Sequence, residues 1–420
     1  MLALLRHRAY RHLLAAQVIA LLGTGLATVA LSLLAYDLAG ARAGSVLGTA
    51  LAIKMVAFVA LAPVVGACAH RLPRRVLLIG ADLLRAAVAL ALPFVTQVWQ
   101  VYLLIFVLQA ASASFTPAFQ SVIPELLPEE REYTRALSLA SLAYDLESLV
   151  SPALAGALLT VIGYHQLFFG TTLGFLASAT LVASVALPDP ARAVPPGGVL
   201  ARATHGTRLF WRVSRLRALL ALNLVVACGG AVVFVNTVVY VRDQLHRGAA
   251  DVPLALGAYG AGSMTAALLL PRALERVPER AVLLGGGFAI TALFLPLAAV
   301  TCAPPAAWKW PALLATWAAL GAACAVVNAP AGRLIRGATA PEHRADAFAA
   351  QFSLSHSCWL LTYPVAGWLG ATAGLPVALA ALGAPALLAA VTAARTWRVD
   401  SRRGMEHPVE VPAPTRSAVR

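Results

Sequence analysis

Long apolar runs separated by short polar segments dominate the chain and predict its secondary structure. Twelve runs approach the ~20 residues that an α-helix needs to cross the hydrocarbon core of a bilayer. In the first half they are Leu13–Leu38, Ser45–Ala69, Val76–Val95, Val98–Phe119, Ala136–Gly163 and Leu167–Leu187. In the second half they are Leu216–Val241, Pro253–Leu270, Ala281–Val300, Ala312–Val327, Ala347–Gly370 and Leu375–Ala394. Helices are expected because a lipid-exposed backbone must satisfy its own hydrogen bonds, and the alternating pattern of a barrel strand does not appear.

Short motifs recur between the two halves at nearly the same offset. The segment HRLPRRVLLIG that begins at His70 resembles ERVPERAVLLG, which begins at Glu275. The span-internal Pro152 likewise recurs as Pro364. Parallel repeats of about six spans, joined by a polar linker, are typical of secondary transporters. The sequence therefore predicts an all-α membrane protein with two six-helix halves, residues 1–187 and 216–397, a linker at 188–215 and a disordered tail at 398–420.

Composition and charge support a membrane location. The chain is 60% hydrophobic and 12% charged, which leaves too little polar surface for a soluble protein of this length. Its net charge of +14 has a topological cause, because the termini and the loops on one side hold 26 basic residues and the opposite loops hold four. This bias predicts that both termini and the linker are cytoplasmic and that the spans cross the cell inner membrane. It also removes the reason to expect a nucleic-acid partner. We also expect no cofactor and a monomer, with the N-terminal run kept as an uncleaved first helix.

Two motifs resemble signatures of the major facilitator superfamily. The loop GACAHRLPRR that begins at Gly66 is similar to the family pattern G-x-x-x-D-R-x-G-R-R, with a histidine in place of the aspartate and a proline in place of the second glycine. The fifth span carries SPALAG, which resembles the antiporter signature of the family. The resemblance implies a twelve-helix fold around a central cavity. The implied gating residues are Gly66, His70, Arg71, Arg74, Arg75, Asp82 and Arg85, and the implied signature residues are Ser151, Pro152 and Gly156.

The stretches Leu31–Lys54 and Thr134–Pro152 look like the proton-driven branch that holds macrolide-type drug exporters and nickel-resistance exporters, and more like the nickel group. This resemblance implies outward transport of a toxic small solute, possible substrates being Ni²⁺ and an amphipathic drug. The histidine-rich tail that some nickel exporters carry is reduced here to His407.

Acidic residues inside spans are the candidates for proton coupling. No G-x-x-x-x-G-K-[ST] loop occurs, so an ion gradient is the expected energy source. Asp145 and Glu147 lie in the fifth span and point in directions about 160° apart, so one can face the cavity while the other braces the halves. Lys54, deep in the second span, needs a carboxylate or water, and its pairing with either acid is a switch or a fixed brace. Asp82 and Arg85, one turn apart, are interpreted as a structural ion pair.

Polar residues of the other spans are candidates for solute binding. His356 and Cys358 lie in the eleventh span, the repeat partner of the fifth, and are either borderline-soft ligands for a divalent metal or packing residues. Amides on helices that line the cavity in the family are Gln17, Gln109, Asn223, Asn236 and Asn328. We expect a transporter and no enzyme. A non-transporting scaffold is an open alternative, as is an intramembrane aspartyl protease, although the Gly-x-Gly-Asp motif of those proteases is absent.

Overall fold

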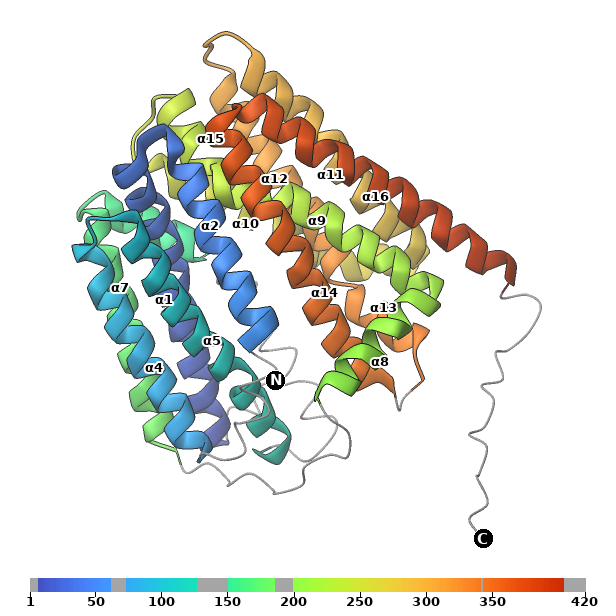
Figure 1. Ribbon diagram of the computed structural model, residues 1–420, viewed down its shortest axis with the longest axis horizontal. Helices are drawn as coiled ribbons and strands as arrows, with labels where there is room; N and C mark the ends of the chain where they lie inside the picture. The colour runs from blue at the N-terminus through green and yellow to red at the C-terminus, as the bar shows by residue number, and fades with distance from the viewer. Residues whose placement is uncertain (1–6, 62–72, 127–149, 186–198, 341–342, 404–420) are drawn as a thin grey trace.

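The computed structural model describes residues 7–61, 73–126, 150–185, 199–340 and 343–403, most of which are helical (Figure 1). The first half contains α1 (Arg8–Ala39), η2 (Gly40–Arg42), α2 (Ala43–Val56), the π-helical η3 (Ala57–Leu61), α4 (Arg74–Ala91), η5 (Leu92–Phe94), α5 (Val98–Leu126), the segment Val150–Leu159 and α7 (Tyr164–Ala183). The second contains α9 (Ser214–Val239), η6 (Tyr240–Gln244), α10 (Asp251–Arg276), α11 (Glu279–Cys302), α12 (Lys309–Asn328), α13 (Ala331–Ala338), α14 (Arg344–Pro364), η8 (Val365–Leu369), α15 (Gly370–Thr372) and α16 (Leu375–Arg403). Each of the twelve predicted spans therefore contains a helix.

The helices have the length and composition of membrane spans. Among the described residues, eight helical units are long and apolar enough to cross a bilayer, and the longest, Arg8–Val59, comprises α1 and α2. Two shorter apolar helices, Val98–Ala113 and Val150–Leu159, lie within the predicted fourth and fifth spans. The structure thus agrees with the all-α membrane architecture that the hydropathy pattern predicts.

The two halves lie side by side, and α2 and α14 diverge toward the end of the molecule where α8 (Val199–Arg212) lies (Figure 1). Helix α8 occupies the second part of the predicted linker. It packs on α14, with Phe210 fully buried and Trp211 62% exposed. A Cβ on Gly206 would lie 2.9 Å from the Cβ of Ala350, so the two helices touch at this glycine. At the other end of the chain, α16 continues to Arg403, into the segment predicted to be disordered.

Small residues allow the helices of each half to pack closely. In the first half, a Cβ on Gly23 of α1 would lie 3.3 Å from the carbonyl oxygen of Thr171 in α7, and the Thr171 hydroxyl donates to the carbonyl of Gly23 at 2.8 Å. In the second half, an added Cβ on Gly262 of α10 would overlap the backbone of α12. Such contacts replace the hydrophobic effect as the main source of helix association in lipid.

Candidate functional site

A cavity of about 310 Å³ lies between the two halves, halfway along α1. Helices α1, α2 and α5 and the segment Val150–Leu159 form one wall, and α9, α10 and α14 form the other. The first wall contains the predicted residues Lys54, Gln109 and Pro152. Most of the lining side chains are apolar, as in sites for organic ligands.

The hydroxyl groups on the α1 side of the cavity are engaged by their own helix. Thr24 donates to the carbonyl of Ala20 at 2.9 Å, Thr28 donates to that of Thr24 at 3.0 Å, and Ser32 donates to that of Thr28 at 3.0 Å. Hydrogen bonds to the i−4 carbonyl are the usual way in which Ser and Thr fit inside a helix. Their protons are therefore not directed at a solute.

The opposite wall carries three aromatic rings, Phe234 of α9, Tyr259 of α10 and Tyr363 of α14. The ring centroids of Phe234 and Tyr259 are 5.4 Å apart in an edge-to-face arrangement. Behind them, Trp359 lies 6.0 Å from Phe234 and 5.1 Å from Tyr363. These contacts hold the rings in fixed orientations, since aromatic pairs favour such geometries.

The halves meet closely at the end opposite α8. A Cβ on Gly48 of α2 would lie 2.6 Å from the carbonyl oxygen of Tyr363, and one on Gly367 of η8 would lie 3.1 Å from the Cα of Gly48. The indole of Trp368 donates to the Thr49 hydroxyl at 2.9 Å. The Nδ2 of Asn236 donates to the carbonyl of Ala366 at 3.3 Å, so this predicted cavity residue lies at the closed end.

Toward the α8 end, α2 and α14 touch through aromatic side chains. Phe58 of η3 lies 6.1 Å from Phe352 and 5.5 Å from His356, measured between ring centroids. The Nδ1 of His356 is 2.7 Å from the carbonyl oxygen of Phe352, so Nδ1 donates and carries the proton of the neutral ring. His356 therefore faces α2, where Lys54 acts electrostatically on its ring.

Cys358 faces a different neighbour from His356. It is buried and lies near Cys228 of α9. The structure thus directs the two predicted metal ligands toward different helices. In the part of the chain that the structure describes, no three His, Cys, Asp or Glu side chains are grouped closely enough to hold a metal ion.

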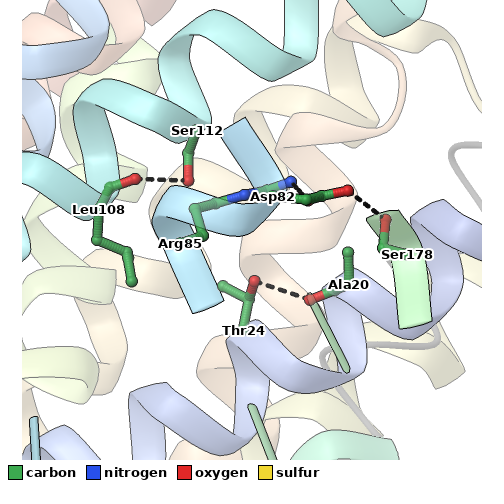
Figure 2. A network of polar contacts seen from close by, with 7 residues as sticks. All are labelled: Ala20, Thr24, Asp82, Arg85, Leu108, Ser112 and Ser178. Atoms are coloured by element: carbon green, nitrogen blue, oxygen red, sulfur yellow. Dashed lines mark hydrogen bonds and ion pairs between the residues drawn. The ribbon is translucent and has the colours of Figure 1, made fainter. Parts of the chain in front are cut away.

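Asp82 and Arg85 form an ion pair in the interior of the first half, as their spacing predicts. Both are buried, and Figure 2 shows Asp82 between Arg85 and Ser178 of α7, whose hydroxyl donates to it at 2.7 Å. The Arg85 guanidinium lies 4.4 Å from the ring centroid of Phe115 and 4.6 Å from that of Phe175. The pair thus ties α4 to α5 and α7.

The remaining predicted residues lie at several places. Gln17 is buried in α1, Asn223 exchanges hydrogen bonds of 3.0 and 3.2 Å with Gln351, and Asn328 is exposed at the end of α12. Ser151 is buried, while Pro152 and Gly156 face Gly257 and Pro253 of α10. Arg75 donates to the carbonyl of Ala183 at the end of α7, and Arg74 begins α4. Gly66, His70, Arg71, Asp145 and Glu147 lie outside the described residues.

Comparison with known proteins places the chain in a family. The sequence matches the Major Facilitator Superfamily over residues 13–308 and again over 219–420. The chain belongs to this superfamily. It is a membrane transporter and not an enzyme. Solved structures agree in fold: a variant of the nucleoside transporter NupG superimposes with a TM-score of 0.71 at 13% identity, covering 92% of this chain and all (100%) of that one.

Two further structures have the same fold. The first is a bacterial homolog of the human lysosomal transporter Spinster, in an inward-facing, unoccupied conformation, with a TM-score of 0.70, 14% identity and coverage of 94% of this chain and 98% of that one. The second is a D-xylose–proton symporter, with a TM-score of 0.67, 14% identity and coverage of 91% and 96%. At these identities the likeness concerns the fold.

Two sequence relatives align over part of the chain. The uncharacterized MFS-type transporter YfiS of Bacillus subtilis is 31% identical over 172 residues, which is 40% of each chain. Macrolide efflux protein A of Streptococcus pyogenes is 30% identical over 148 residues, which is 34% of this chain and 36% of the relative. The chain thus aligns with less than half of the length of either relative.

The aromatic wall of the cavity is the feature that sequence reasoning missed. Trp359 and Tyr363 are four residues apart and share a face of α14, a spacing that the sequence does contain. Phe234 and Tyr259 belong to other helices, and only the packing of α9, α10 and α14 brings these rings to one cavity.

Proposed function

We propose that the chain exports amphipathic organic compounds across the cell inner membrane in exchange for protons. The observation that carries this proposal is the cavity between the halves, whose walls are mainly aliphatic and aromatic. An apolar site with a few polar groups suits an organic solute better than a hydrated divalent cation, which requires oxygen, imidazole or thiolate ligands. Similarity to macrolide efflux protein A supports efflux of this kind over part of the chain.

Alternating access is the mechanism by which the two halves would move the solute. The contact of Gly48 with Gly367 closes one end of the cavity, and the contact of Phe58 with Phe352 is the corresponding contact toward α8. Both contacts are present in this structure, and rocking of the halves would open one of them while the other stays closed. The basic bias of the loops favours cytoplasmic termini, and a reporter fused after Arg420 that responds to the periplasm would contradict this orientation.

Asp145 and Glu147 are the acids that we assign to proton coupling, with Lys54 as the cation that exchanges partners with them. Lys54 lines the cavity, so a change in its ion-pair partner would change the electrostatic potential at a bound solute. Asp82 is less suited to this role because Arg85 and Ser178 already engage its carboxylate. A coupling acid must be neutral in one state and charged in the other.

Uptake into inverted membrane vesicles tests the proposal. With an imposed proton gradient, vesicles that contain the protein should accumulate a lipophilic fluorescent compound and should not accumulate Ni²⁺. Either Asp145→Asn or Glu147→Gln should abolish the effect of the gradient while downhill exchange continues, because only the titratable step is lost. Gradient-driven uptake of Ni²⁺ alone would favour metal export. Full coupling in both variants would refute the assignment of the acids.

A further inference from the structure

The two walls of the cavity differ in chemistry. Among the described lining residues, the aromatic rings all come from the second half, as Phe234, Tyr259 and Tyr363. The side-chain nitrogen donors, Gln109 and Lys54, come from the first half. A solute between these walls meets three aromatic rings on one side and the two nitrogen donors on the other, so the cavity orients what it binds.

Close packing holds the aromatic wall in place. A Cβ on Gly230 would overlap the indole of Trp359, so this glycine gives Trp359 room to support both Phe234 and Tyr363. A Cβ on Gly321 of α12 would likewise overlap the backbone of Tyr259 and prevent the present approach of α10 to α12. The rings are therefore positioned before a solute arrives, which lowers the entropic cost of binding.

The donor wall favours acceptor groups on the solute. The hydroxyl protons of Thr24, Thr28 and Ser32 are used within α1. Gln109 is 8% exposed and lines the cavity, so its amide N–H groups would lose water when a solute enters. A carbonyl, ether or carboxylate oxygen on the solute would accept hydrogen bonds from this amide in place of water.

The volume limits the size of the solute. About 310 Å³ is near the lower end of the range for small-molecule sites, roughly 300–1,000 Å³, so the cavity in this conformation suits a compound of two or three fused rings.

We propose that the solute is a planar aromatic compound whose ring packs against Phe234, Tyr259 and Tyr363 and whose hydrogen-bond acceptor faces Gln109. This inference rests on the proposed function, because it names the solute class of the same cavity. Aromatic packing geometry, beyond the apolar area that is buried, supplies the preference for a planar ring.

Calorimetric titration of the purified full-length chain tests the aromatic wall with two matched ligands. 2-Naphthoate and decahydro-2-naphthoate share a carboxylate and a two-ring skeleton, and differ in planarity and aromatic character. The parent protein should bind 2-naphthoate about tenfold more tightly, and Phe234→Leu or Tyr363→Leu should reduce this ratio to about 1. Phe294→Leu is the matched control, because Phe294 packs on Gly383 in the second half and does not line the cavity.

A third ligand tests the donor wall. 2-Naphthylmethylammonium keeps the ring and replaces the acceptor with a donor cation, so the parent should bind it about tenfold more weakly than 2-naphthoate, and Gln109→Leu should narrow this difference. Equal binding of 2-naphthoate and its saturated analogue, or a ratio that survives in Phe234→Leu and Tyr363→Leu, would overturn this inference and leave the proposed function intact. Binding of none of the three ligands by a protein whose vesicles accumulate Ni²⁺ would overturn both.

Discussion

Asp82 and Arg85 are buried charged residues, and each stabilises the charge of the other. Their spacing of three residues on one helix is visible in the sequence and was sufficient to predict the pair. Ser178, Phe115 and Phe175, which complete the surroundings, come from α7 and α5, and no sequence pattern connects them to α4. Single-helix spacing can predict partners on the same helix, whereas partners on other helices depend on tertiary packing.

Removal of one member of this pair should destabilise the first half. Asp82→Asn leaves the guanidinium of Arg85 without its carboxylate in a buried site, which we expect to cost about 3–5 kcal/mol and to lower the thermal midpoint of the purified protein. The double variant Asp82→Leu with Arg85→Met should recover most of the loss, because it buries no charge. A single variant as stable as the parent, or a stable double variant that no longer transports, would contradict a structural role.

The crossing of α2 with η8 is the tightest contact between the halves at the end opposite α8. Pro364 lies at the end of α14, where the backbone continues as the π-helical η8, and proline interrupts the regular hydrogen bonding of an α-helix. The sequence shows the proline and its repeat partner Pro152, but it shows neither the π-helix nor the glycine contact that follows. Helix α8 lies inside the segment that was predicted only as a linker.

A methyl group at this crossing should shift the balance between conformations. A Cβ on Gly367 would overlap the backbone of Gly44, so Gly367→Ala should force α2 and η8 apart, at a cost to the closed state of about 1–3 kcal/mol. Spin labels at Val161→Cys and Trp308→Cys, both exposed positions, should report a longer distance. Gly370→Ala is the matched control, because its Cβ would make an ordinary contact at 3.5 Å with Asn236. Equal distances in the two variants would contradict this role of Gly367.

At the scale of the whole molecule, the internal repeats predicted two halves, and the hydropathy pattern predicted twelve spans, each of which contains a helix among the described residues. The central cavity was predicted only because the sequence resembles a family whose members have one. Its lining depends on which faces of six or more helices turn toward the centre, and a helix that is apolar on all sides carries no sequence signal for its inward face. For this reason Lys54 and Gln109 were found from their polarity, while Phe234, Tyr259 and Tyr363 were not.

The central claim is that solute crosses the membrane through the cavity between the halves, and filling that cavity tests it most directly. Ala50 is buried and lines the cavity, so Ala50→Trp should occupy much of its 310 Å³. Ala289 is exposed in an open groove between α11 and α12, so Ala289→Trp adds the same side chain away from the cavity. In inverted vesicles with equal amounts of protein, uptake of a lipophilic fluorescent compound should fall to background in Ala50→Trp and persist in Ala289→Trp. Full uptake by Ala50→Trp would contradict the account.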